Sequence, residues 1–69
     1  MQWETIKGNW RQFQGHAEEY WGKITQDEFA QIEGHRDVLI GKIQAHYGVS
    51  EEQAEAQIEE FLAKLRSEQ

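Results

Sequence analysis

The sequence predicts an all-α protein, a single small four-helix domain that spans residues 1–69. Three observations support this fold class. Large apolar residues recur at steps of three and four along the first third of the chain, two helix-capping motifs precede the later segments, and no segment alternates like a strand. Because a chain of this length buries only about 60% of its unfolded surface, we expect one compact unit with a small core.

The first helix is expected over residues 3–21. Its apolar residues follow one side of a helix; they are Trp3, Ile6, Trp10, Phe13, Ala17, Tyr20 and, just beyond, Ile24. Gly22 is expected to end the helix in the left-handed conformation. Glycine inside a helix is about 1 kcal/mol less favourable than alanine, so the sequence leaves open whether the helix continues through Gly8 and Gly15.

A capping box predicts that the second helix begins after Thr25 and covers residues 26–33. The Thr25 hydroxyl can accept from the Glu28 amide, while the Glu28 carboxylate reaches back to Thr25, and Ile24 and Phe29 stand at the hydrophobic-staple positions. Gly34 is expected to separate this helix from a third over residues 35–47. The apolar residues of that third helix spread around its circumference, which predicts the most buried helix of the fold.

The last helix is expected over residues 51–66. Ser50 and Gln53 repeat the capping arrangement, and Gly48 is the preceding stop signal. The inward face of this helix is expected to contain Ala54, Ile58, Phe61, Leu62 and Leu65. The predicted core of the whole domain is Trp3, Ile6, Trp10, Phe13, Trp21, Ile24, Phe29, Ile32, Leu39, Ile43, Tyr47, Ile58, Phe61, Leu62 and Leu65.

Composition narrows the classes of function. The net charge is −6 and most of the excess acid lies in the last helix, which disfavours DNA or an anionic membrane as the partner. The amino terminus does not have the pattern of a signal peptide and no apolar run approaches a bilayer span, so we expect a soluble, unexported protein. Because the mean hydropathy is low, an intrinsically disordered chain stays an alternative. The three Trp and three Phe nevertheless favour a folded protein.

Glycines mark two similar stretches that we call the first repeat, residues 15–24, and the second repeat, residues 34–43. Each repeat opens with Gly-His and closes with Gly-Lys-Ile, and the six glycines fall on two heptad series: Gly8, Gly15, Gly22 and Gly34, Gly41, Gly48. One interpretation is helix ends plus close packing, with Gly41 where two backbones approach. The other is a smooth face for a partner helix, or a first helix that folds on binding. The candidate interaction face is Gly8, Gly15, Lys7 and Arg11.

No set of residues predicts catalysis, and we expect no cofactor. The histidines His16, His35 and His46 have no partner at the i, i+4 spacing of a metal pair, and the chain has no cysteine. The Gly-Lys-Ile elements lack the hydroxyl residue of a phosphate loop. Trp10 with Lys7 and Arg11 could stack on and neutralise single-stranded nucleic acid, but a core role for Trp10 is the better interpretation.

A family resemblance rests on ordered Gly-Lys and Trp-Gly-Lys elements along nearly the whole chain. These are Gly8-Asn9-Trp10, Gln12-Phe13, Gly15, Trp21-Gly22-Lys23-Ile24-Thr25, Ile32-Glu33-Gly34, Arg36-Asp37, Leu39, Gly41-Lys42-Ile43-Gln44 and Tyr47-Gly48. The chain resembles the CsbD-like family of small bacterial proteins, and most closely its YjbJ type. The resemblance implies a cytoplasmic protein raised in general stress or stationary phase, with a SAM-domain-like four-helix fold, and it implies no reaction.

Three hypotheses of function follow. The first is a non-enzymatic, stress-associated helical module that binds an unknown protein partner or a second molecule of itself. The second is a hydrophilic protectant that acts in bulk. The third, a nucleic-acid binder that uses Lys7, Arg11, Lys23 and Lys42, is the least favoured of the three.

Overall fold

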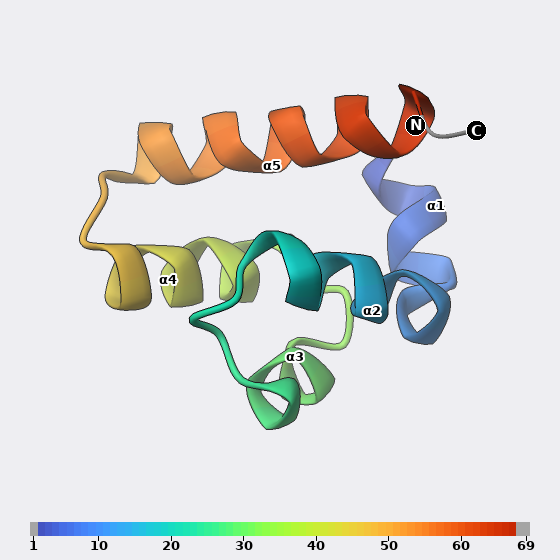
Figure 1. The fold of residues 1–69 in the computed structure, drawn as a ribbon, viewed down its shortest axis with the longest axis horizontal. Coiled ribbons are helices and arrows are strands. Elements are labelled where there is room, and N and C mark those ends of the chain that lie inside the picture. The colour runs from blue at the N-terminus through green and yellow to red at the C-terminus, as the bar shows by residue number, and fades with distance from the viewer. Residues whose placement is uncertain (1, 68–69) are drawn as a thin grey trace.

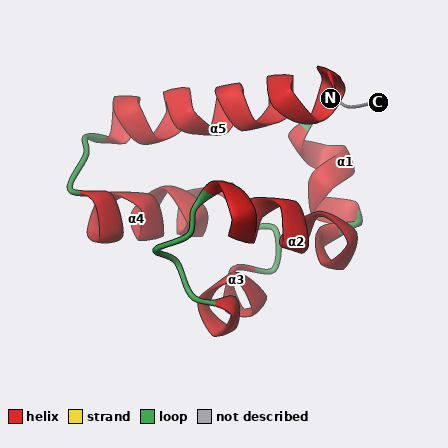
Figure 2. Cartoon of the chain, in the orientation of Figure 1, coloured by secondary structure: helices red, strands yellow, loops and turns green. Residues whose placement is uncertain are grey.

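The computed structural model describes residues 2–67, which form five helices and, within that range, no strand (Figures 1 and 2). The helices are α1 (Trp3–Gly8), α2 (Trp10–Tyr20), α3 (Gln26–Ile32), α4 (Arg36–Tyr47) and α5 (Glu51–Ser67). The all-α prediction is confirmed, but the predicted count of four helices is wrong. The SAM-domain-like arrangement that the family resemblance implies stays a prediction.

The extra helix arises because the predicted first helix divides at Asn9. The backbone of Asn9 leaves the helical region, with φ −125° and ψ 39°, and its side-chain amide donates to the carbonyl oxygen of Thr5 at 3.0 Å. Asparagine favours helix ends because its side chain competes for backbone groups in this way, and the preceding Gly8 weakens the helix further. α1 therefore turns away from α2 (Figure 1), while α2 continues unbroken through Gly15.

α1 is held in its new direction by the turn between α3 and α4. The indole nitrogen of Trp3 donates to the carbonyl oxygen of Gly34 at 2.9 Å. A Cβ built on Gly34 would lie 2.9 Å from the Cα of Lys7, so the two backbones meet where only glycine fits. Gly34 has φ 80° and the preceding Glu33 has φ 52°, both in the left-handed region. The predicted break at Gly34 is confirmed, and the same residue is the point at which α1 packs on the turn.

Both predicted capping boxes are confirmed. The Glu28 amide donates to Thr25 Oγ1 at 3.2 Å while the Thr25 amide donates to the Glu28 carboxylate at 3.2 Å. At the start of α5 the Gln53 amide donates to Ser50 Oγ at 3.1 Å, and the Ser50 amide donates to the Gln53 side chain at 2.9 Å. These reciprocal bonds fix the beginnings of α3 and α5 one residue after each cap.

Two predictions about glycines are wrong. Gly22 does not adopt a left-handed backbone, since α2 already ends at Tyr20 and the chain leaves it through Trp21. Gly41 is not a point of backbone approach, because a Cβ there would meet nothing within 4 Å. Gly48, by contrast, ends α4 with φ 65°, as predicted for a left-handed helix stop.

The core lies where the five helices meet, with α1 contributing Ile6, and α4 and α5 run side by side (Figure 1). The buried apolar residues are Ile6, Trp10, Phe13, Ala17, Trp21, Ile24, Phe29, Ile32, Leu39, Ile43, Ala54, Ile58, Phe61, Leu62 and Leu65. Two residues of the predicted core, Trp3 and Tyr47, are only partly buried and pack against its edge.

α4 is not the most buried helix, contrary to the prediction from its spread of apolar residues. Only Leu39 and Ile43 of α4 are fully buried, and Val38 is 39% exposed. α5 buries five residues instead. The reason is that α4 packs on α3 and α5 but leaves a further side to solvent.

The three tryptophans join helices that are distant in sequence. Besides the bond from Trp3 to Gly34, the Trp10 indole donates to the Phe29 carbonyl at 2.8 Å and the Trp21 indole donates to the Gln57 side chain at 2.9 Å. Trp10 and Trp21 therefore bury their rings, and Trp3 partly buries its ring, while each indole N–H keeps a hydrogen-bond partner. None of the helices that the structure describes combines the length and apolar character that a bilayer crossing requires.

Candidate functional site

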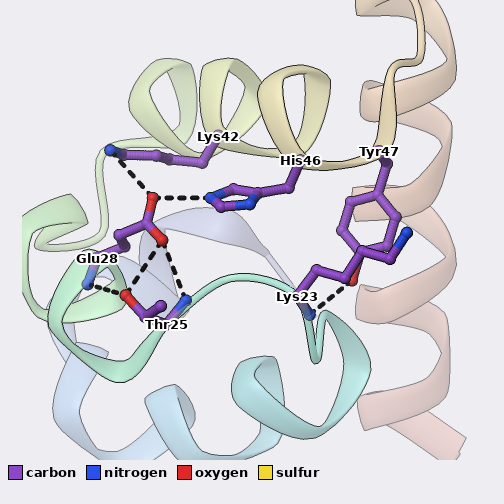
Figure 3. A network of polar contacts seen from close by, with 6 residues as sticks. All are labelled: Lys23, Thr25, Glu28, Lys42, His46 and Tyr47. Atoms are coloured by element: carbon purple, nitrogen blue, oxygen red, sulfur yellow. Dashed lines mark hydrogen bonds and ion pairs between the residues drawn. The ribbon is translucent and has the colours of Figure 1, made fainter.

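The densest polar cluster surrounds the carboxylate of Glu28, in the first turn of α3 (Figure 3). From α4, His46 Nε2 lies 2.8 Å and Lys42 Nζ lies 3.3 Å from Oε2 of Glu28. The other carboxylate oxygen accepts from the amide and the hydroxyl of Thr25 at 3.2 and 3.1 Å. Both oxygens of Glu28 are thus occupied by groups of the fold itself.

These contacts lower the pKa of Glu28 from 4.5 to about 2. The hydrogen bond from His46 is the largest cause, followed by the backbone amide of Thr25, because each favours the ionised carboxylate. A general acid or base works best with a pKa near the working pH. The pKa of Glu28 is shifted away from that range, so this cluster is a structural contact between α3 and α4, which we call the α3–α4 clasp.

The same end of α4 also contacts the loop after α2. The backbone amide of Lys23 donates to the Tyr47 hydroxyl at 3.1 Å, and Lys23 Nζ lies 5.2 Å from the centre of the Tyr47 ring (Figure 3). Lys23 and Lys42, two of the four cations considered for nucleic-acid binding, therefore already contact other groups of the protein. This arrangement weakens the nucleic-acid hypothesis.

The candidate interaction face, Gly8, Gly15, Lys7 and Arg11, is distributed over two helices. Gly8 and Lys7 belong to α1, and Lys7 packs against Gly34, whereas Arg11 and Gly15 lie one turn apart on α2. All four residues are exposed, and a Cβ on Gly8 or Gly15 would meet nothing within 4 Å. The break at Asn9 means that the two glycines do not lie along one continuous helix.

A shallow groove between α2 and α3 contains one of these four residues. Its lining side chains are Trp10, Arg11 and Gln14 from α2, Ala30 from α3, and Glu33 from the turn after α3. The Trp10 indole N–H is already bonded to the Phe29 carbonyl, and Trp10 is buried, so only a small part of its ring borders the groove beside the exposed Ala30. The groove therefore has an apolar part, a cation and an anion.

Metal binding has no candidate residues in the part of the chain that is described. Across residues 2–67, no three His, Cys, Asp or Glu side chains are grouped so that they could hold an ion. His16 and His35 are exposed, while His46 is half-buried and contacts Glu28. The third histidine thus belongs to the α3–α4 clasp.

Sequence reasoning missed two parts of this surface. Lys42 and His46 are four residues apart on α4, and that spacing places a lysine and a histidine side chain on one helical face, so it could have predicted a shared acidic partner. Glu33 and Ala30 carried no such signal. Their place in the groove depends on how α3 packs on α2, which the sequence pattern does not specify.

Comparison with known proteins places the chain among small bacterial proteins. A sequence profile described as CsbD-like matches residues 4–56. The UPF0337 protein YjbJ of Escherichia coli (strain K12) is 53% identical over 51 residues, which are 74% of each chain. A UPF0337 protein of Pectobacterium atrosepticum is 46% identical over 61 residues, 88% of each chain, and one of Pseudomonas aeruginosa is 40% identical over 65 residues, 94% of this chain and all of its own.

No solved structure matches this chain. The profile match covers most of the sequence, and the relatives align over most of their own length. The ordered Gly-Lys and Trp-Gly-Lys elements fall largely within the matched range. The chain is therefore a member of the CsbD-like family and is of its YjbJ type.

Proposed function

We propose that this chain is a non-enzymatic helical interaction module of the bacterial stress response, which acts in the cytoplasm by binding a partner protein or a second molecule of itself. It uses no cofactor. The stress setting and the cytoplasmic location are what the resemblance to CsbD-like proteins implies. The binding role is argued from the fold.

The observation that carries this proposal is the pairing of all three tryptophan N–H groups. Each donates to a specific acceptor between 19 and 36 residues away in sequence, at 2.8 to 2.9 Å. Pairing of this kind requires one defined packing arrangement, because an unpaired buried N–H would destabilise the fold by about 1–3 kcal/mol. A defined fold presents a defined surface, which a binding module needs and a bulk protectant does not.

The chemistry of the polar groups also favours binding over catalysis. Glu28, whose pKa is lowered to about 2, is held in its ionised form by His46, Thr25 and Lys42. Its low pKa suits a structural contact better than proton transfer near neutral pH. A hydrophilic protectant remains the alternative, and it predicts that surface identity is unimportant.

Site-specific photo-cross-linking in stressed cells tests the proposal. A photoreactive amino acid would replace Gly15 on α2, Ala45 on α4 or Ala56 on α5, which are three exposed small residues on different helices. An interaction module gives a discrete adduct from one face and little from the others. Equal, diffuse labelling at all three positions would contradict the module and favour the protectant.

The mass of the adduct adds a second result. An adduct at twice the mass of the chain identifies a second molecule of this protein, whereas another discrete mass identifies a different partner. A variant with Ile43→Asp should lose the discrete adduct, because a charge at a fully buried position disrupts the fold. Retention of the adduct in that variant would contradict recognition by a folded surface.

A further inference from the structure

We propose that the α2–α3 groove is a self-complementary dimer interface, in which Arg11 of each molecule binds Glu33 of the other. This inference deepens the proposed function and rests on it, since it names the partner as a second copy of this chain. It is argued from the two charged residues that border the groove and from the surface between them.

Arg11 stands at a position that the fold itself does not favour for a cation. It is the second residue of α2, and the first turn of this helix contains no acidic residue. The amino end of a helix carries partial positive charge, so an acid there would stabilise α2 and a cation does the opposite. The exposed guanidinium has no part in the three ion pairs found within residues 2–67.

Glu33 also stands at an unfavourable position. Between residues 2 and 67 it is the one non-glycine residue with a positive φ, 52°, a conformation that strains most L-residues. Glycine would relieve that strain. The carboxylate of Glu33 is exposed and takes part in none of the three ion pairs found within the described range. Neither charge is thus used in an ion pair of the described range, and both line one groove.

A groove with a cation and an anion is complementary to itself under two-fold rotation. If the two-fold axis passes between the charges, Arg11 of one molecule faces Glu33 of the second molecule, and the same pair forms again on the other side of the axis. Two opposite charges across such an interface favour this alignment and disfavour others. The dimer thus contains two Arg11–Glu33 pairs, one on each side of the axis.

The surface next to the charges suits close approach. Ala30 is small and exposed, and Trp10 borders the groove with only a small exposed part, whose indole N–H is already satisfied by the Phe29 carbonyl. Gly15 lies one turn after Arg11 on α2, and a Cβ there would meet nothing within 4 Å in the same molecule. Gly15 has no packing role within the monomer, and the absence of a side chain there would let the backbone of a second molecule approach α2 closely.

The interface would be small, so the dimer should be weak and should depend on concentration. Sedimentation velocity of the intact chain, from micromolar to millimolar concentration, measures this directly. We expect a reversible monomer–dimer equilibrium. A wild-type protein that stays monomeric at millimolar concentration would overturn the inference.

Charge reversal provides the specific test. Arg11→Glu and Glu33→Arg should each raise the dissociation constant of the homodimer at least about tenfold, because each leaves like charges facing one another twice. An equal mixture of the two variants should form a heterodimer, because the glutamate introduced in one molecule then faces the arginine introduced in the other. The unchanged Glu33 of the first variant faces the unchanged Arg11 of the second, so both pairs carry opposite charges.

The double variant Arg11→Glu/Glu33→Arg should also recover the homodimer, because it exchanges the two charges and keeps each pair complementary. Sedimentation velocity of the mixture and of the double variant measures both rescues. Failure of both would overturn the inference.

Three controls keep the result interpretable. Arg66→Glu changes the net charge as Arg11→Glu does, but lies on α5, and should leave dimerisation unchanged. Arg11→Glu should melt at the same temperature as wild type or higher, because it places an acid in the first turn of α2. Glu33→Gly should melt higher and dimerise less, which a purely structural role of Glu33 would not produce.

The outcomes also separate this inference from the proposed function. A monomeric wild-type chain that still gives a discrete adduct of another mass in stressed cells keeps the interaction module and removes the self-complementary dimer. A chain that dimerises in solution as expected, but gives diffuse labelling in cells, keeps the dimer and removes the module as its cellular role.

Discussion

The two repeats have the same spacing in sequence but different structures. Gly15, which opens the first repeat, lies inside α2 with open space around it, whereas Gly34, which opens the second, forms a buried left-handed turn against Lys7. The second glycine of each repeat shows the reverse. Gly22 of the first repeat lies in a loop, whereas Gly41 of the second repeat lies inside α4. The repeated residues therefore do not form a repeated structural unit.

The closing Lys-Ile pairs show which part of the pattern the two repeats share. Lys23 lies over the Tyr47 ring, while Lys42 binds Glu28, so the lysines serve different contacts. Ile24 and Ile43 are both buried. Apolar spacing therefore carries over between the repeats, while the role of each glycine depends on what packs beside it.

The greatest loss of stability should come from the isoleucines that the repeats do share. Ile24→Ala and Ile43→Ala should each lower the free energy of unfolding by about 2–5 kcal/mol, because each removes buried methyl and methylene groups and leaves a cavity. Chemical denaturation followed by tryptophan fluorescence measures both. A loss below about 1 kcal/mol at one position only would show that the repeats differ even in their core residue.

The opening glycines should give opposite results, with the larger effect at Gly34. Gly34→Ala should destabilise the fold by roughly 2–4 kcal/mol, because the new Cβ would lie 2.9 Å from the Lys7 Cα at a residue with φ 80°. Thermal and denaturant unfolding measure the loss. A variant as stable as wild type would mean that α1 does not need this close approach to Gly34.

The parts of the fold that the sequence predicted correctly depend on residues close together in the chain. The capping boxes at Thr25 and Ser50 each involve groups three residues apart, and the apolar spacing of α5 identifies its buried face. The sequence left open whether the first helix continues past Gly8, and it did not predict the direction of α1, which depends on contacts with Gly34; the Trp3 bond to Gly34 spans 31 residues. Local patterns cannot report such contacts.

The candidate surface was predicted less completely, for the same reason. Arg11 and Gly15 were singled out from the glycine pattern, and they do lie together on α2. Glu33 entered only as part of the Ile32-Glu33-Gly34 element of the family resemblance, since its left-handed backbone and its place in the groove with Arg11 follow from the packing of α3 on α2. The spread of apolar residues around α4 predicts a helix that is covered on all sides, yet Val38 is exposed, so this spread alone does not identify the most buried helix.

The lysine of the second repeat, unlike that of the first, belongs to the α3–α4 clasp, which should depend on pH. Because the pKa of Glu28 is lowered from 4.5 to about 2, its carboxylate stabilises the folded state fully above pH 4.5, and this contribution is lost as the pH falls from 4.5 towards 2. The difference in unfolding free energy between wild type and Glu28→Gln should shrink over that window. We expect a smaller change than at Gly34, because the carboxylate side chain is 21% exposed.

An NMR titration of the Glu28 carboxyl separates the contributors. His46→Gln should raise its pKa most, Lys42→Gln should raise it less, and Lys23→Gln, the matched change in the first repeat, should leave it unchanged. Titration of Glu28 near pH 4.5 in the wild-type protein would contradict the α3–α4 clasp.

The weakest effect on stability should be found at Gly15 and Gly41, two exposed glycines inside helices. Gly15→Ala and Gly41→Ala should each stabilise the monomer by up to about 1 kcal/mol, because alanine restricts the unfolded chain and its methyl group meets nothing within 4 Å. Thermal unfolding at low micromolar concentration, where the weak dimer that we propose should dissociate, measures both gains. A loss of stability at Gly15 would mean that its surroundings in α2 are not open.

Their effects on association should differ, which separates a glycine kept for an interface from one that is not. Gly15 lies one turn after Arg11, so a methyl group there should hinder the approach of a second molecule and raise the dissociation constant of the dimer. Gly41 lies on α4, outside the groove, and its substitution should leave the dimer unchanged. If both substitutions stabilise the monomer and neither affects the dimer, Gly15 of the first repeat, like Gly41 of the second, has no role at an interface.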